Sequence, residues 1–326
     1  MSWPEGIEAR PMEKADVEAW AVLTAAAEKV DQEGEHFSAE DLAEQLDRPN
    51  FNLAQDTISL WADGRMIGYG MVHVSPSVVD VDRVHVGGTI DPEWRRRGLG
   101  TTLMRWLIKR AGELHAATHP DFPGQVGVGA ASNNVSAISL LESLDFKAER
   151  FFFDMRRPLD QPVPEASIAD GLRLTSYDPS YEEALRLAHF EAFSDHWGWA
   201  PPDPAVWRSR NVGSRAFRGA QSYLVLDGET VAAYVNGYEW EADTEATGVR
   251  ELYIGQVGTR RAYRGRGLAR GAIAKVLAEA AQAGYQRAAL GVDADNPTGA
   301  LGLYENLGFT THNKFTSYAL PIPSDV

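Results

Sequence analysis

Residues 251–269 read ELYIGQVGTRRAYRGRGLA, a strand-like run followed by a basic, glycine-rich turn and the start of an amphipathic helix. Residues 82–100 read DRVHVGGTIDPEWRRRGLG and repeat this order in the first half of the chain. A second pair also matches, because NNVSAISLLESLDF (133–146) and NPTGALGLYENLGF (296–309) each predict a short helix before an apolar strand. Matching positions lie roughly 163 to 169 residues apart, so the chain is one duplicated module and not a short-period solenoid.

Length and composition limit the classes of protein to consider. The 326 residues suit two domains of about 150 residues each. No apolar run approaches the roughly 18 residues of a membrane helix, the first residues carry no apolar signal segment, and cysteine is absent. We therefore expect a cytoplasmic protein without thiol chemistry. The net charge of −15 repels nucleic acid and anionic membranes and attracts cationic small molecules, although it also fits solubility alone.

A proline-containing stretch without a hydrophobic period, QPVPEASIAD at 161–170, is interpreted as a linker. It predicts an N-terminal domain over 1–160 and a C-terminal domain over 171–326. In each domain a helical stretch precedes strands joined by an Asp-Gly turn, and the glycine-rich turn, its helix and a β-α-β piece follow. Strands and helices mixed in this order predict an α/β (α+β) fold with helices on both faces of a sheet.

The two glycine-rich turns, RRRGLG (95–100) and RGRGLA (264–269), have the features of an anion site. The first turn of a helix has unpaired N–H groups at the positive end of its dipole, and glycine lets this backbone approach phosphate oxygens. Neither turn contains the GxxxxGK[ST] of a P-loop, and both lack the third glycine of GxGxxG. The remaining pattern, [QR]-x-x-G-x-[GA], is explained equally well by a structural turn when it occurs once, but here it occurs twice in register.

These segments resemble the GNAT superfamily of acetyltransferases. The glycine-rich turn matches its acyl-CoA motif, and Asn296, Ala300, Tyr304 and Gly308-Phe309 match its second hallmark at intervals of four residues. Residues i and i+4 share one face of a helix, so the first three line one stripe. The resemblance covers nearly the whole chain and implies two GNAT folds in tandem, each a mixed, mostly antiparallel central sheet flanked by helices. The tandem order and the ending GFTTHNKFTSYAL are most similar to mycothiol synthase and its actinobacterial relatives.

The resemblance implies acetyl-CoA as the cofactor. The strand before the turn would offer backbone groups to the pantetheine arm, the turn would cradle the pyrophosphate, and the hallmark Asn would bond the pantetheine or cap its helix. In the second half these residues are Gln256, Val257, Gly258, Thr259, Arg264, Gly265, Arg266, Gly267, Leu268, Ala269 and Asn296. In the first half they are Gly88, Thr89, Ile90, Arg95, Arg96, Arg97, Gly98, Leu99, Gly100 and Asn133.

The resemblance also implies that Tyr304 is the general acid, protonating the CoA thiolate. A phenol suits this role because its ordinary pKa of about 10 is close to that of a thiol. Leu141 stands at the matching position of the first half, and Asp145 replaces Gly308. We therefore expect catalysis in the C-terminal domain only, with the first domain binding acetyl-CoA structurally or completing the substrate cleft. The alternative for Tyr304 is a core aromatic residue on an amphipathic helix.

Many members of the superfamily carry a base, a Glu, on the strand before the turn. The candidate is Glu251, two residues before the usual place, which Tyr253 occupies. The strand period of two keeps both on one face but moves the carboxylate roughly 7 Å away. Glu239, Glu241 and solvent are the alternatives, and Asp82 holds the matching place in the first half.

The first helices of a module form part of the acceptor pocket in this superfamily. The segment HFEAFSDHWGW (189–199) is rich in aromatic and titratable groups. Asp195, His196 and Trp197 are predicted to bind a polar or cationic acceptor, together with Glu239 and Tyr253. An ordinary helix C-terminus, with His196 favourable to the dipole, explains the segment equally well. No His, Cys or Asp cluster has the spacing of a zinc site, so no metal is predicted.

The sequence thus predicts direct acetyl transfer from acetyl-CoA to a primary amine of a small molecule in a ternary complex. The expected partner is the amine, with no nucleic acid and no membrane, and the chain is expected to be a monomer or a homodimer. The enzymatic alternative is acetylation of a protein N-terminus or lysine. The alternative from another class is a non-catalytic acyl-CoA-binding sensor or scaffold, for which the phenol of Tyr304 has no use.

Overall fold

The chain forms two compact units in the computed structural model, which describes residues 3–295 and 299–323. The first unit consists of Met1–Phe151 with Phe315–Val326, and the second of Phe152–Lys314. These units differ from the expected division into 1–160, 161–170 and 171–326. The difference arises because the last strand of each sequence module belongs largely to the other unit.

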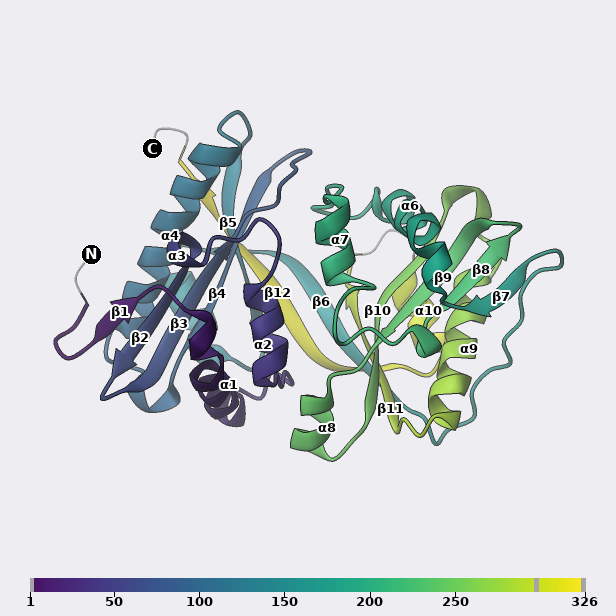
Figure 1. The fold of residues 1–326 in the computed structure, drawn as a ribbon, viewed down its shortest axis with the longest axis horizontal. Coiled ribbons are helices and arrows are strands. Elements are labelled where there is room, and N and C mark those ends of the chain that lie inside the picture. Colours follow the sequence, from purple (N-terminus) through teal and green to yellow (C-terminus); the bar gives the residue numbers. More distant parts are fainter. Residues whose placement is uncertain (1–2, 296–298, 324–326) are drawn as a thin grey trace. The chain divides into compact units, whose positions relative to one another are not determined.

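The first unit is built on a mixed, mostly antiparallel sheet, as expected (Figure 1). Its strands are ordered β1 (Glu8–Arg10), β2 (Thr57–Ala62), β3 (Arg65–His73), β4 (Asp82–Ile90), β5 (Gly124–Ala131) and β12 (Thr310–Ile322). Only β4 and β5 are parallel, and the other neighbours are antiparallel.

Side chains of β3 point to both faces of this sheet, with a register shift opposite Leu60 and Trp61 that interrupts their alternation, and helices cover both faces. Met66 and Met71 pack with Trp20 of α1 (Val17–Asp31) and Leu42 of α2 (Ala39–Leu46). Ile67 packs on the other face, in the cluster that contains α4 (Leu99–Thr118) and α5 (Val135–Ser143). The short α3 (Leu53–Asp56) leads into β2.

The second unit repeats this plan. Its strands are ordered β6 (Lys147–Pro158), β11 (Arg287–Asp293), β10 (Glu251–Thr259), β9 (Thr230–Tyr238), β8 (Tyr223–Asp227) and β7 (Arg173–Ser176), with only β10 and β11 parallel. The helices are α6 (Glu182–Phe193), α7 (Pro204–Arg210), α8 (Glu241–Thr247), α9 (Leu268–Gln282) and α10 (Ala300–Asn306). Tyr234 packs with α6 and α7 on one face, and Val235 packs with α9 on the other.

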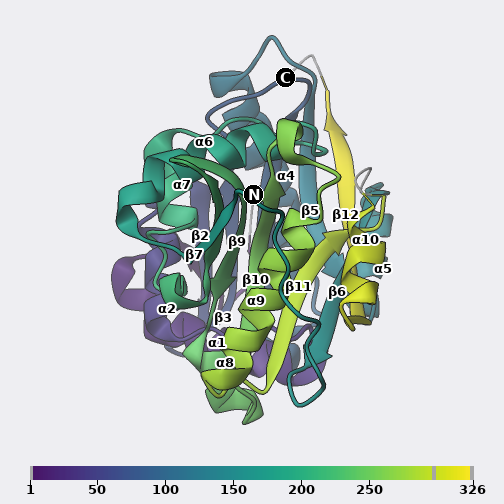
Figure 2. The same ribbon diagram turned by 90° about the vertical axis from the view of Figure 1, so that its right-hand side faces the viewer.

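The terminal strands are exchanged between the modules. Residues 152–158 of β6 pair with β11, which places Met155 in the core of the second unit. Residues 315–322 of β12 pair with β5, which places Tyr318 in the core of the first unit. Figure 1 shows the yellow β12 beside the blue β5, and Figure 2 shows the teal β6 beside β11. Each unit therefore needs a strand from the other module to complete its sheet.

The expected linker belongs to the second unit. Val163 and Ile168 pack against its core, and the backbone oxygen of Ser167 would lie only 2.3 Å from a Cβ on Gly271 of α9. Arg157 is buried and donates a hydrogen bond of 2.8 Å to the carbonyl of Pro162. The stretch is therefore held along the sheet and helix that it covers.

The parallel strands of each unit separate part-way along their length and form a fork. In the second unit β10 pairs with β11 only from Glu251 to Ile254, and then continues to Thr259 paired with β9 alone among the described strands. In the first unit β4 pairs with β5 only from Asp82 to His85, and then continues to Ile90 paired with β3. Over these residues one edge of each strand is consequently not paired with any other described strand.

Candidate active site

The fork of the second unit contains the strand residues expected to meet pantetheine, Gln256 to Thr259. The Gln256 amide oxygen accepts hydrogen bonds from the Tyr238 hydroxyl at 2.6 Å and from Asn236 at 3.3 Å. Gly258 is required by packing, because a Cβ there would lie 2.3 Å from the ring of Tyr234. The side chains around the fork thus hold this strand in place and leave its backbone edge for a ligand.

The turn after this strand has the geometry of an anion site. Gly265 and Gly267 have φ angles of +74° and +73°, where glycine is strongly favoured, and no atom lies within 4 Å of a Cβ placed on either. Gly267 is the N-cap of α9, whose 15 residues begin at the buried Leu268, followed by Ala269. The open space and the unpaired N–H groups at the start of α9 fit the pyrophosphate of acetyl-CoA.

The first arginine of each turn is anchored within the protein. Arg264 donates to the Thr259 carbonyl at 3.3 Å and forms an ion pair of 3.0 Å with Asp195. Arg95 makes the same contacts in the first unit, with the Ile90 carbonyl at 2.9 Å and with Asp31 at 2.6 Å. These ion pairs hold each turn against the C-terminal end of the first long helix of its unit, α1 or α6, so both guanidinium groups are engaged within the protein.

The other turn arginines differ between the units. The Arg266 guanidinium lies 5.7 Å from the Tyr263 ring centre, and that of Arg97 lies 4.6 Å from the ring centre of Trp94. Gly98 is the N-cap of α4 with a φ of +81°, and Leu99 and Gly100 follow it. Arg96 has a φ of +63° where the second unit has Gly265, so the first turn keeps its shape without that glycine.

Tyr304 lies on α10 with 7% of its surface exposed. Burial raises the pKa of Tyr304 to about 12, and the nearby Tyr253 contributes to the same shift. The backbone confirms its correspondence with Leu141, because the Phe309 N–H donates to the Tyr304 carbonyl at 3.0 Å and the Phe146 N–H to that of Leu141 at 3.1 Å. One unit therefore places a phenol at this point and the other an aliphatic side chain.

The expected base, Glu251, lies at the start of β10, where this strand is still paired with β11. Its carboxylate forms an ion pair with Arg287 and lies 3.8 Å from Arg156. Asp82, the matching residue of the first unit, is fully buried and 2.7 Å from His115. Both carboxylates thus have cationic or polar partners on the paired side of the fork.

Glu239 also forms a structural cluster. It is buried and accepts hydrogen bonds from Arg218, Arg250 and Tyr285. Burial alone would raise the pKa of Glu239, but these hydrogen bonds outweigh burial and lower its pKa to about 2. Glu241, on α8, has a largely exposed side chain 3.5 Å from Arg218.

The residues expected to bind the acceptor, Asp195 to Trp197, follow α6. Asp195 forms ion pairs with Arg261 and Arg264, whose hydrogen bonds lower the pKa of its carboxyl group. The His196 ring stacks on Phe193 with 4.3 Å between ring centres, and burial lowers its pKa. Asp195 is therefore part of the ion-pair network that holds the glycine-rich turn, and burial disfavours the protonated form of His196.

Asn133 and Asn296 occupy the matching asparagine position of the second hallmark in the two modules. In the first unit, Asn133 donates hydrogen bonds to the carbonyls of Asp31 at 3.0 Å and Gln32 at 2.9 Å, which connects α5 to the end of α1. Asn296 lies outside the described residues. Its expected contact with pantetheine stays a prediction.

The sequence interpretation missed Tyr234 and His189. Tyr234 is fully buried opposite Gly258 in the β9–β10 pair, and its hydroxyl lies 2.7 Å from Nδ1 of His189. Burial lowers the pKa of His189 to about 4, so the ring is neutral near pH 7. Tyr234 could have been recognised as the residue that faces Gly258 on the neighbouring strand. This requires the register between β9 and β10, which only the fold provides.

The described part of the chain was compared with the requirements of a membrane-spanning helix and of a metal site. No helix there is both long and apolar enough to cross a membrane. Within the same residues, no three His, Cys, Asp or Glu side chains are grouped so that they could hold a metal ion.

A family model, the acetyltransferase (GNAT) family, matches the chain twice, over residues 19–146 and 181–309. The chain belongs to the GNAT acetyltransferase family. The expected tandem arrangement is thereby confirmed, and the chain is an acyltransferase that uses acetyl-CoA.

Relatives of the whole chain support this. The mycothiol acetyltransferase of Salinispora tropica is 30% identical over 318 residues, covering 94% of this chain and 93% of its own length. That of Mycolicibacterium gilvum is 32% identical over 249 residues, covering 73% and 74%. The expected similarity to the mycothiol synthase group is confirmed.

Solved structures share the fold. A GCN5-related N-acetyltransferase from Sphaerobacter thermophilus has a TM-score of 0.76 at 26% identity, covering 98% of this chain and 97% of that chain. A tandem GNAT protein from the clavulanic acid biosynthesis pathway, without acetyl-CoA, has a TM-score of 0.73 at 16% identity, covering 97% and 99%. The latter similarity concerns the fold alone.

Proposed function

We propose that the second unit acetylates a primary amine of a small molecule by direct transfer, with Tyr304 as general acid. The observation that carries this proposal is the difference between the units at one helical position. Both units have the fork and the turn, but only the second has a buried phenol there, where the first has Leu141.

The chain's own residues supply binding and orientation. The turn from Arg264 to Ala269 would hold the pyrophosphate through the N-terminus of α9, and the free edge of Gln256–Thr259 would hold the pantetheine arm by backbone hydrogen bonds. Bound acetyl-CoA supplies the acetyl group and a thiol leaving group. Because the strand edge is fixed by its pairing with β9, the thioester carbonyl would be oriented without reorganisation of the backbone.

Tyr304 would hold the proton for the leaving thiolate on its Oη atom. Its pKa of about 12 keeps the phenol protonated at every pH at which the enzyme is expected to work. Burial penalises a thiolate in the same site as well as a phenolate, so the proton affinities of the two groups rise together. The match between acid and leaving group is therefore maintained inside the protein.

The proton of the acceptor ammonium would leave to water. Glu251 is held by Arg287, and Glu239 has a pKa of about 2, so neither carboxylate is well placed to take up a proton. Glu251 is instead proposed to fix the start of β10 beside β11 through this ion pair. The amine itself is proposed to be of the small-molecule kind, because relatives named mycothiol acetyltransferase match most of the chain.

The test is the Tyr304→Phe variant, which removes one hydroxyl. We expect kcat to fall by about 10²–10⁴-fold, while the acetyl-CoA dissociation constant changes less than about threefold. The measurements are thiol release with a panel of small primary amines, set against lysine and N-terminal peptides, and calorimetry for acetyl-CoA.

The matched control is Tyr318→Phe, which removes the hydroxyl of a tyrosine in the core of the first unit and should leave kcat unchanged. Unchanged turnover in Tyr304→Phe would remove Tyr304 from the mechanism. Turnover of peptides alone would overturn the small-molecule acceptor.

A further inference from the structure

Arg157 is a buried cation that has no part in the reaction as described so far. It lies on β6, the last strand of the first sequence module, with 2% of its surface exposed. Its guanidinium group donates hydrogen bonds to the carbonyls of Leu307 at 2.7 Å, Pro158 at 3.0 Å and Pro162 at 2.8 Å. All three acceptors are neutral backbone oxygens. Burial lowers the pKa of Arg157, so its charge has an energetic cost that these hydrogen bonds must offset.

One of these carbonyls ends the helix that carries Tyr304. Leu307 is the C-cap of α10, and its N–H donates to the Tyr304 carbonyl at 3.0 Å. The carbonyls at the end of a helix lack helical partners and lie at the negative end of its dipole, where a cation is favourable. Two hydrogen bonds, made by the C=O and the N–H of Leu307, therefore connect Arg157 to the backbone of Tyr304.

The position of α10 depends on contacts outside the helix. Its seven residues are fewer than the roughly 12 that make an isolated helix stable in water. Its N-cap, Gly299, has no side chain to bond the first turn. Apart from the core packing of Tyr304 and Leu307, the C-terminal end is thus where a described side chain holds this helix.

The first unit has no counterpart of this arginine. Arg157 faces Ala288, the second residue of β11, whereas Pro321 of β12 faces Gln125, the second residue of β5. The two places are equivalent, because β11 and β5 each begin opposite the first residue of their parallel neighbour. A proline side chain has no donor. The matching helix, α5, is therefore not held at its C-terminal end in this way.

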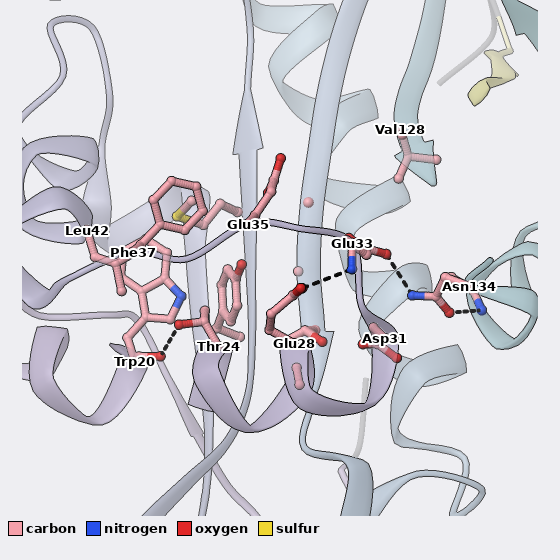
Figure 3. Close-up of a pocket in the computed structure, with 18 of the residues that line it drawn as sticks. Trp20, Thr24, Glu28, Asp31, Glu33, Glu35, Phe37, Leu42, Val128 and Asn134 are labelled. Atoms are coloured by element: carbon pink, nitrogen blue, oxygen red, sulfur yellow. Dashed lines mark hydrogen bonds between the residues drawn. The ribbon is translucent and has the colours of Figure 1, made fainter. Parts of the chain in front are cut away.

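α5 is fixed at its first turn instead. Its N-cap Asn134 accepts a hydrogen bond of 3.1 Å from the Ala137 N–H and donates one of 2.8 Å to Glu33 (Figure 3). Leu141 of the same helix lines a cavity of about 410 Å³ with an aromatic and acidic wall. The helix with the phenol is thus the one that a cation fixes at its C-terminal end.

A glycine accompanies the arginine. A Cβ on Gly308, which has a φ of +88°, would lie 3.1 Å from Nε of Arg157. In the first unit Asp145 stands at the Gly308 position with a φ of +65°, and Pro321 stands at the Arg157 position. A side chain is therefore accommodated after the helix where the arginine is absent, which indicates that Gly308 leaves room for the guanidinium group.

We propose that Arg157 is a positioning residue for Tyr304, an inference that rests on the function proposed for this tyrosine. The guanidinium group holds the Leu307 carbonyl, which fixes the last turn of α10 and keeps the Tyr304 hydroxyl in one place relative to the thioester. A displacement of about 1 Å can lower a rate by about 100-fold, so a fixed helix end matters for turnover. The last strand of the first module would thereby support the reaction of the second unit.

The test compares Arg157→Met with the native full chain. Methionine keeps an unbranched, apolar side chain but removes the charge and the donors. We expect kcat to fall at least about tenfold, and the acetyl-CoA dissociation constant from calorimetry to change less than about threefold, because the turn proposed to hold the cofactor belongs to other elements. The control is Arg173→Met, which removes an exposed arginine from β7, at the other end of the strand order, and should leave kcat within about twofold of native.

A double variant shows whether Arg157 acts through the phenol. Residues that act as a unit give non-additive effects, so Arg157→Met should lower kcat less than about twofold in a chain that already carries Tyr304→Phe. A further tenfold loss in that background would overturn the inference. Failure of the proposed function has a different signature, because Tyr304→Phe alone would then leave kcat unchanged.

Hydrogen exchange reports the state of the helix end without turnover. The N–H groups of the buried Phe309 and Phe146 donate to the carbonyls of Tyr304 and Leu141 at 3.0 and 3.1 Å, which makes them a matched pair. In Arg157→Met, exchange of the Phe309 N–H should accelerate at least about tenfold and that of Phe146 less than about twofold.

Arg157→Lys is the second variant, for which loss of the fold is not expected because the charge is kept. Lysine lacks the forked donors of arginine, so kcat and the protection of the Phe309 N–H should each fall about threefold, between the native chain and Arg157→Met. Unchanged exchange of the Phe309 N–H in either folded variant would overturn the inference, whatever the effect of Tyr304→Phe.

Discussion

The first and second units share a backbone plan but differ in the side chains placed on it. Tyr69 faces Thr89 across β3 and β4, and Tyr234 faces Gly258 across β9 and β10, so the two tyrosines occupy equivalent places. In the second unit Tyr234 bonds to His189 within a packed cluster, whereas in the first unit Tyr69 lines an open cavity. Duplication therefore preserved strand pairing and changed what faces the fork.

The two glycine-rich turns are held by equivalent ion pairs. Arg95 with Asp31 and Arg264 with Asp195 repeat one ion pair between turn and helix end. The strongest resemblance between the units thus concerns the support of the turn, and the strongest difference concerns Leu141 and Tyr304. A shared scaffold with a phenol in only one unit is consistent with the proposed catalytic role of the second unit.

The largest effect is expected from separating the sequence modules. Fragments 1–160 and 161–326 each lose an exchanged strand, because β5 then lacks β12 and β11 lacks β6. Neither fragment should show cooperative thermal unfolding by circular dichroism. Fragment 152–314, which keeps residues 152–158 beside β11, is the control and should unfold cooperatively. Cooperative unfolding of 161–326 alone would contradict the exchange.

The next effect concerns the two turns. Gly267→Glu places a carboxylate and a Cβ at a positive φ where the pyrophosphate is expected, so acetyl-CoA should bind the second unit at least about 100-fold more weakly and turnover should be lost. The same change at Gly98 should leave turnover within about threefold of native, because the proposed acid, Tyr304, lies in the other unit. Calorimetry and thiol release measure both. Equal loss of turnover from the two variants would contradict the division of roles.

A smaller effect should follow from the buried phenol. The folded chain holds the pKa of Tyr304 at about 12, above the value of about 10 for an exposed tyrosine, so its contribution to stability is complete below pH 10 and is lost as pH rises through 12. Between pH 10 and 12 the free energy of unfolding of Tyr304→Phe should therefore fall by about 2–3 kcal/mol less than that of the native chain. Urea unfolding across this range measures it.

Leu141→Phe is the control for this experiment, because it changes the matching position without a titrating group. Its free energy of unfolding should differ from native by a constant amount over the same pH range. A constant difference for Tyr304→Phe as well would show that the phenol has an ordinary pKa in the folded chain.

The smallest effect is expected at Glu251. Because Arg287 and Arg156 hold this carboxylate, Glu251→Gln should lower kcat less than about tenfold and leave the acid limb of the pH–rate profile in place. Steady-state kinetics between pH 6 and 10 measure it. Loss of that limb, together with a drop in turnover of about 100-fold or more, would instead make Glu251 the base.

Most of the correct sequence predictions rest on patterns of residues that are close together in the chain. Glycines in two turns, an Asn-x-x-x-Ala-x-x-x-Tyr stripe and the contrast of Leu141 with Tyr304 are readable without a structure, because turn conformation and helix faces depend on residues close in sequence. The family and the mixed sheet followed from them and were confirmed. Partners far apart in the chain were not readable in this way, as the ion pairs of Glu251 and Asp195 show.

The sequence by itself determined the duplicated module, the two glycine-rich turns and the place of Tyr304, since each depends on short-range geometry. The tertiary structure decided which strand completes each sheet, which carboxylates are neutralised and where a cavity remains. Those properties depend on strand pairing, burial and charge contacts between residues tens to hundreds of positions apart. Spacing along the chain does not encode such contacts directly, so the exchanged strands and the acidic, aromatic cavity emerged only from the fold.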